Sequence, residues 1–126
     1  MKSRPFLPAI IYGLLIFILF SLPIKELDKI QSLNKFFRLI FSDYTMHFFA
    51  FGIFTALLCY GFLKRNPLSI PCFRVGLISI SFGLFIEAYQ GLLSYRSFSL
   101  KDLLSNMVGI FVTLILVRIY IALRKS

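Results

Sequence analysis

Residues 5–24, PFLPAIIYGLLIFILFSLPI, form an apolar run without a single charged side chain. A helix needs about 20 such residues to cross a hydrocarbon core about 30 Å thick. Three further runs of similar length follow, interrupted only by isolated polar side chains. Lipid offers backbone groups no hydrogen-bonding partner, and the many short alternating segments of a barrel are not visible, so helices are the expected structure. The sequence therefore predicts four membrane-spanning helices, at residues 5–24, 44–63, 75–95 and 103–123.

The composition is that of a membrane protein. Of the 126 residues, 59% are hydrophobic and 15% are charged, whereas soluble domains average about half and about a quarter. The chain is short enough for one domain, and we find no long linker or internal repeat in it. We expect one all-α domain over residues 1–126, a polytopic membrane protein with its four transmembrane helices in a small bundle.

The basic residues predict the orientation of these helices. With four spans, the N-terminus, the 64–74 loop and the C-terminus share one side, which carries eight basic residues and no acidic one. The other side carries six basic residues and all five acidic residues. Because cytoplasmic loops are enriched in Lys and Arg, both termini are expected in the cytoplasm. The net charge of +9 then reflects topology and contact with anionic lipids, not a nucleic acid partner.

The segment 28–41, DKIQSLNKFFRLIF, differs from the spans because basic and apolar residues alternate in it. Ile30, Leu33, Phe37 and Ile40 recur at helical spacing. This pattern favours an amphipathic helix in the membrane interface. The alternative is an ordinary loop helix packed against the ends of the bundle.

Polar side chains converge on one end of the predicted bundle. The span 44–63 begins at the outer side, the span 75–95 finishes there, and the span 103–123 begins there again. Ionisable groups within spans are rare and mark functional sites. The candidate ligand-binding residues at this outer end are Asp43, His47, Glu87, Gln90, Arg96, Asp102 and Asn106.

The spacing of these residues supports a shared site, although each residue alone has a structural interpretation. Glu87 has Arg96 and His47 as candidate partners, and its protonation state stays open. Asp102 follows Ser99 at the spacing of a capping box, so it can serve the start of a helix. A lone histidine among phenylalanines is more often structural than catalytic. Apart from Arg96, the site residues form three pairs at intervals of three or four residues, which places each pair on one helix face. The pairs are Asp43 with His47, Glu87 with Gln90, and Asp102 with Asn106.

Gly109 lies on nearly the same helix face as Asp102 and Asn106, which predicts a close approach of a neighbouring helix there.

Other chemistry has little support in the sequence. Cys59 and Cys72 lack the spacing of metal ligands. The chain has a single His and no HExxH or multi-histidine cluster, so we expect no metal ion and no cofactor.

The residues around the candidate site resemble the VanZ-like membrane proteins. Ser21-Leu22-Pro23 and Asp43-x3-His47 belong to the resemblance, which covers roughly residues 9–120. Two positions depart from the family pattern: Tyr44 stands where a Lys is common, and Ile86 where an acid is common. The loss of that acid weakens any paired-carboxylate mechanism. The most specific part reads Glu87-x2-Gln90-x5-Arg96-x5-Asp102-x3-Asn106-x2-Gly109.

The resemblance implies a bacterial inner-membrane protein of about four helices. The family's namesake is an accessory factor in low-level resistance to teicoplanin, a glycopeptide directed at cell-wall precursors. Antibiotic resistance and a role in the cell envelope are therefore expectations for this chain, while no reaction is firmly attached to the family. A homo-oligomer is compatible with four short helices.

Two main hypotheses about function follow. In the first, the site binds a lipid-linked ligand or a phosphate- or carboxylate-bearing headgroup, with Arg96 meeting the anion, and the protein is not an enzyme. In the second, it is a small hydrolase or transferase in which His47 acts as base and Asp43 or Glu87 orients it. A proton or ion pathway through an oligomer is a third alternative, because acids and histidines in spans can form relays.

Overall fold

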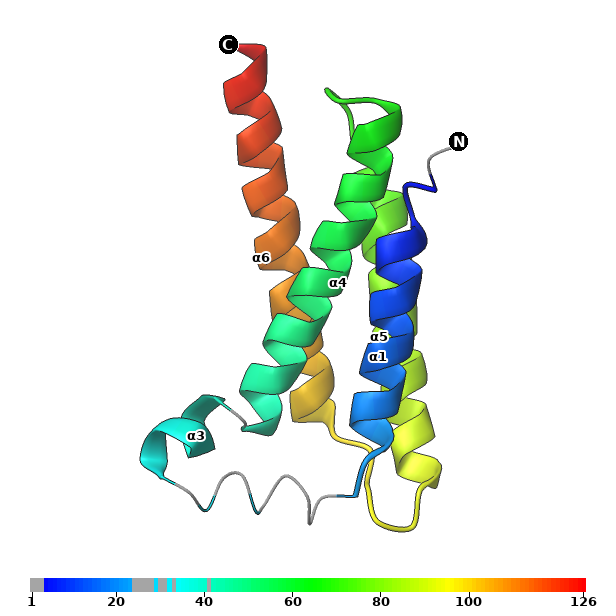
Figure 1. The fold of residues 1–126 in the computed structure, drawn as a ribbon, viewed down its shortest axis with the longest axis vertical. Coiled ribbons are helices and arrows are strands. Elements are labelled where there is room, and N and C mark those ends of the chain that lie inside the picture. Colours follow the sequence, from blue (N-terminus) through cyan, green and yellow to red (C-terminus); the bar gives the residue numbers. More distant parts are fainter. Residues whose placement is uncertain (1–3, 24–28, 30–31, 33, 41) are drawn as a thin grey trace.

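The computed structural model describes residues 4–23, 29, 32, 34–40 and 42–126 of the chain. Within these residues it contains helices and no strand, which confirms the all-α class. The start of α1, the α4–α5 connection and the end of α6 lie at one end of the molecule, as Figure 1 shows. The helices are α1 (Leu7–Ser21), α3 (Lys35–Ile40), α4 (Asp43–Arg65), α5 (Cys72–Leu92) and α6 (Leu100–Lys125).

The four predicted apolar runs are all helical, and three of them are long and apolar enough to cross a membrane. These are α4, α5 and α6, with 23, 21 and 26 residues. The helix α1 has 15 residues, which is about 22 Å at 1.5 Å per residue. It ends because Leu22 is extended, as the residue before a proline prefers to be. A fourth crossing by α1 stays a prediction.

Serine caps fix where α4 and α6 begin. The Ser42 hydroxyl accepts a hydrogen bond from the backbone N–H of Thr45, at 3.4 Å. The Ser99 hydroxyl accepts one from the N–H of Asp102, at 3.2 Å. Each cap satisfies a donor that the first turn of a helix leaves unpaired. The Ser99 half of the predicted capping box is confirmed, whereas the Ser99 N–H donates to Glu87 and not to Asp102. The helix α6 begins at Leu100, three positions before the predicted span.

Helices α4 and α6 pack most closely, through glycines on their facing sides. A Cβ atom on Gly109 would overlap the carbonyl oxygen of Phe48 and approach the backbone of Gly52. Across the same contact, the Thr113 hydroxyl donates to the carbonyl of Gly52 at 3.2 Å. The close approach predicted at Gly109 is therefore confirmed, with α4 as the neighbouring helix.

We expect Gly109→Ala to lower the free energy of unfolding by about 1–3 kcal/mol, because its methyl group would force α4 and α6 apart. Gly76→Ala is the matched control, since a Cβ there meets only Leu114 at an ordinary 3.6 Å. Denaturation in detergent micelles measures both variants. Equal stability of the two would contradict the packing described for α4 and α6.

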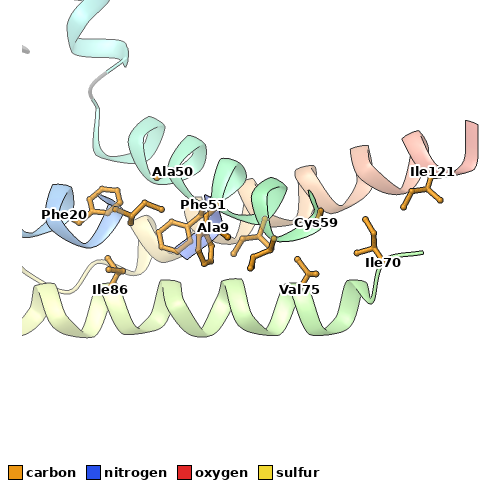
Figure 2. Close-up of a cluster of buried hydrophobic side chains, with 13 residues drawn as sticks. Ala9, Phe20, Ala50, Phe51, Cys59, Ile70, Val75, Ile86 and Ile121 are labelled. Atoms are coloured by element: carbon orange, nitrogen blue, oxygen red, sulfur yellow. The ribbon is translucent and has the colours of Figure 1, made fainter. Parts of the chain in front are cut away.

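The apolar core runs along the length of the bundle. Figure 2 shows it extending from Phe20 at one end to Ile70 and Ile121 at the other, with Phe51 between them. Phe51 and Ile86 are fully buried. The core holds α1 against α4 and α5, so the end of α1 is brought to the end of the bundle where the polar residues lie.

The segment predicted to lie in the membrane interface is helical over Lys35–Ile40, which is α3. The remainder of 28–41 is described only at residues 29, 32 and 34, so most of that prediction lies outside the described residues. Phe36 and Leu39 are exposed, at 65% and 69%. Figure 1 shows α3 projecting to the side of α4, at the end of the molecule opposite the C-terminus. Its position relative to a membrane stays a prediction.

Candidate functional site at one end of the bundle

The predicted site residues lie where α1 and α5 end and where α4 and α6 begin. In Figure 1 this is the end of the molecule that carries α3 and the α5–α6 connection. Four of the seven predicted residues meet there in one buried cluster. These four are His47 from α4, Glu87 from α5, and Asp102 and Asn106 from α6.

His47 is at the centre of this polar cluster. Its side chain is only 2% exposed, and its Nδ1 atom lies 2.8 Å from the Asn106 amide oxygen. An amide oxygen only accepts hydrogen bonds, so Nδ1–H donates to it. The other nitrogen, Nε2, lies 3.7 Å from Asp102 Oδ2. One face of the ring is stacked on Phe20 of α1, with ring centroids 4.3 Å apart.

Glu87 is fully buried beside the histidine. Its Oε2 atom accepts a hydrogen bond from the backbone N–H of Ser99, at 3.2 Å. Its Oε1 atom lies 3.5 Å from His47 Nδ1 and is buried without a hydrogen-bond partner among the described residues. The Nδ2 atom of Asn106 is in the same situation. Such atoms are uncommon in folded proteins.

Two other predicted residues, Gln90 and Arg96, hold the end of α1. A helix leaves its last carbonyl groups without intrahelical partners. Gln90 Nε2 donates to the carbonyl of Phe20 at 3.0 Å, and Arg96 donates to that of Leu22 through Nε and Nη2, at 3.2 and 3.0 Å. Tyr95 O–H donates to the carbonyl of Ser21 at 2.6 Å. These bonds place Phe20 against His47.

The two side chains predicted as partners of Glu87 therefore lie in different places in the structure. His47 is adjacent to Glu87, whereas the Arg96 guanidinium lies on the end of α1. Asp43 is exposed in the first turn of α4, one turn before His47, on the rim of the cluster. Its negative charge near the start of α4 is favourable for the helix dipole.

Sequence reasoning did not identify the contribution of α1 to this site. Phe20 carried no signal, because it looks like any other apolar residue of a span. Tyr95 carried none either, since its contact is with a backbone carbonyl. The Ser21-Leu22-Pro23 motif was noticed only through a family resemblance, and the carbonyls that it supplies to Tyr95 and Arg96 give it a physical reason.

The cluster also contains a set of possible metal ligands that linear spacing did not reveal. One ligand atom from each of His47, Glu87 and Asp102 can be chosen so that all three lie within 4.8 Å of one another. The three residues are far apart in the chain and come from three helices. Sequence reasoning looked for short motifs and repeated histidines, so it expected no metal here.

The fold and the site define a small all-helical membrane protein with a buried polar cluster at one end of its bundle. The family model that matches this chain is VanZ/LLP1, over residues 9–121, so the protein belongs to the VanZ/LLP1 family. Comparisons with curated proteins and with solved structures returned no match.

Proposed function

We propose that the protein is a non-enzymatic envelope factor that binds a lipid-linked ligand bearing a phosphate or carboxylate group. In this proposal it crosses the bacterial inner membrane four times, with both termini in the cytoplasm, and the ligand's headgroup lies at the outer end. The observation that carries the proposal is an apolar groove that runs along the helices and stops beside the polar cluster.

The groove has a volume of about 640 Å³ and lies between α1, α4 and α5. It extends from Phe6 to Phe17 along α1 and from Ile78 to Phe85 along α5. All of its lining side chains are apolar, and Ile78 is 45% exposed. An apolar groove on helices that span a membrane is filled by hydrocarbon, so an acyl or polyprenyl chain is the matching occupant.

One end of the groove lies near the level of the polar cluster along the bundle. Along the axis of α5, Phe85 at the rim is about 3 Å from Glu87, although residues two apart lie on different faces of a helix. Phe17 lies one turn before Phe20, whose ring is stacked on His47. A chain lying in the groove would therefore bring its headgroup next to the end of α1 and the α5–α6 connection.

Exposed basic side chains lie at that end of the bundle. Lys35 and Arg38 on α3 and Lys101 on α6 are exposed. Arg96 has five N–H donors, and its Nε and Nη2 donate to Leu22, which leaves donors for a phosphate or carboxylate oxygen. This arrangement favours an anionic headgroup over a neutral one.

The burial of His47 favours binding over catalysis. A general base must come within hydrogen-bond reach of the proton that it removes. Here the ring is covered by Phe20 and its Nδ1–H is held by Asn106. Within the cluster, Asp102 is more accessible than His47 and Glu87, with 14% of its side chain exposed against 2% and 0%.

Lipid identification by mass spectrometry tests the proposal, using protein purified in a mild detergent. We expect the wild-type protein to retain an anionic lipid well above its share of the membrane. Ile78→Trp should fill the groove and displace most of this lipid, whereas Leu77→Trp, on an exposed neighbour outside the groove lining, should not. Arg96→Ala should reduce retention, and Arg74→Ala, at the other end of the bundle, is its control. Equal retention by all four variants would overturn the proposal.

The orientation has its own prediction. Reporter enzymes or fluorescent proteins fused after Arg65 and after Ser126 should both report the cytoplasm, because eight basic residues lie on that side. A fusion within the α5–α6 connection, after Ser94, should report the opposite side. Cytoplasmic signals from all three fusions would contradict four crossings.

The proposal extends to the cell envelope. A lipid-linked cell-wall precursor carries both the long apolar chain and the anionic group that the groove and the basic end fit. Expression of the wild-type protein in a susceptible bacterium is therefore expected to lower its sensitivity to teicoplanin, and Ile78→Trp should abolish the effect. Unchanged sensitivity with the wild-type protein would remove this extension and leave the lipid measurement unaffected.

A further inference from the structure

We propose that His47, Glu87 and Asp102 form a binding site for one divalent transition-metal ion of the Mn²⁺ or Zn²⁺ class. This inference rests on the polar cluster alone and does not depend on the proposed lipid ligand. The three residues offer one imidazole and two carboxylates from three different helices, with ligand atoms within 4.8 Å of one another. Ligands about 2.0–2.2 Å from a zinc ion lie roughly 3–4 Å apart, so small side-chain movements suffice.

The unpaired oxygen of Glu87 is the independent observation that points to a cation. The side chain is fully buried, and Oε2 is satisfied by the Ser99 N–H. Oε1 faces His47 and has no hydrogen-bond partner among the described residues. A buried carboxylate normally pairs with a charge or coordinates a metal, because leaving it unpaired is costly. A metal ion supplies the missing partner.

The orientation of His47 fits metal binding. A histidine that binds a metal through one nitrogen commonly donates its other N–H to an oxygen, which fixes the tautomer. Here Nδ1–H donates to the Asn106 amide oxygen at 2.8 Å. The lone pair is then on Nε2, which lies 3.7 Å from Asp102 Oδ2. Glu87 Oε1 lies 3.5 Å from the other nitrogen, Nδ1, so the Glu87 side chain must turn to reach an ion bound at Nε2. Asn106 is therefore assigned as a positioning residue for the imidazole.

The charges around the site also favour a dication. Two acidic side chains lie beside the imidazole, and Arg96, which the sequence offered as a candidate partner for Glu87, donates to the carbonyl of Leu22 instead. A divalent ion balances both carboxylates. It would also provide positive charge to a phosphate-bearing ligand in a cluster that otherwise presents acids to it.

The ligand set indicates the class of ion. One nitrogen with two carboxylates suits Mn²⁺ or Zn²⁺, whereas Mg²⁺ prefers oxygen ligands and keeps several waters. Three protein ligands leave at least one coordination position open. Asp102, with 14% of its side chain exposed, lies on the side from which an ion and a further ligand can enter.

Metal binding is tested on full-length protein in detergent, stripped with EDTA and titrated with ZnCl₂ or MnCl₂ without added lipid. Elemental analysis and calorimetry should give one ion per chain, and the ion should raise the Tm because it binds the folded state. Glu87→Gln and Asp102→Asn should each weaken binding by about tenfold or more. Asp43→Asn, at the same end but outside the ligand set, removes only a nearby charge and should weaken binding much less than either of these two substitutions.

A spectroscopic readout separates coordination from a merely structural role. Electron spin echo spectra of the Mn²⁺-loaded protein should contain a ¹⁴N coupling from the imidazole, and His47→Gln should lose it. The proposal would be overturned if the wild-type protein did not bind the ion stoichiometrically. This measurement uses no variant, so a variant that fails to fold does not affect it. The proposal would also be overturned if Asp43→Asn weakened ion binding as much as Glu87→Gln and Asp102→Asn do. Lipid retention measured in EDTA distinguishes this failure from failure of the proposed lipid binding.

Discussion

Asn106→Leu is expected to lower the free energy of unfolding by about 1–3 kcal/mol, because it removes the amide oxygen that accepts from the buried Nδ1–H of His47. Asn106 also packs closely against Gly83 of α5, because a Cβ atom added to Gly83 would lie only 3.3 Å from Asn106 Nδ2. The larger leucine side chain would therefore press on Gly83. The cost therefore has two sources, a lost hydrogen bond and crowding between α5 and α6.

The same substitution at Asn66 is the matched control for Asn106→Leu. Asn66 is exposed where α4 ends, and its side chain accepts from the nearby N–H of Leu68. We expect a change within about 0.5 kcal/mol there, as for most surface positions. Denaturant titration in micelles measures both variants. A stability loss at Asn66 equal to that at Asn106 would mean that the buried contact with His47 contributes nothing.

Gln90→Leu is the second substitution with a large expected effect. The Gln90 amide is buried, at 2% exposure, and donates to the carbonyl of Phe20. Without it that carbonyl is unsatisfied, at a cost of about 1–3 kcal/mol. The cost should appear as local opening of the end of α1, because Arg96 and Tyr95 hold only the next two carbonyls.

Hydrogen exchange measured by mass spectrometry locates this opening. In Gln90→Leu we expect faster exchange in peptides covering the end of α1, with little change in the middle of α4. Ser94→Ala, on the exposed connection after α5, should exchange as the wild type does. If α1 is equally protected in Gln90→Leu and the wild type, the hydrogen bonds at its end do not hold it in place.

Much of this fold was predictable because hydropathy alone requires it. Apolar runs of about 20 residues, with few polar side chains in them, favour helices in lipid because a helix pairs its own backbone groups. The convergence of His47, Glu87 and Asn106 was predictable as well, since it follows from the direction in which successive helices run. Gly109 predicted the close approach of a neighbouring helix, because a residue without a side chain lets two helix backbones meet, and the structure shows that this helix is α4.

The details that sequence could not supply are those decided by helix rotation and by the backbone. Among the described residues, Arg96 forms no ion pair with an acid and donates instead to the carbonyl of Leu22 at the end of α1. Phe20 becomes part of the site only through the angle at which α1 ends. The three possible metal ligands lie on three helices, so no short motif in the chain joins His47 to Glu87 or Asp102.

A double-mutant cycle between His47 and Asn106 tests most directly whether residues of separate helices form one contacting polar cluster. His47→Phe, Asn106→Leu and the double variant are unfolded in micelles, and their changes in free energy are compared. We predict a coupling of about 1–3 kcal/mol, because residues in contact lose one shared interaction only once. Additivity within about 0.5 kcal/mol would show that the two side chains are not in contact, and would contradict the site described above.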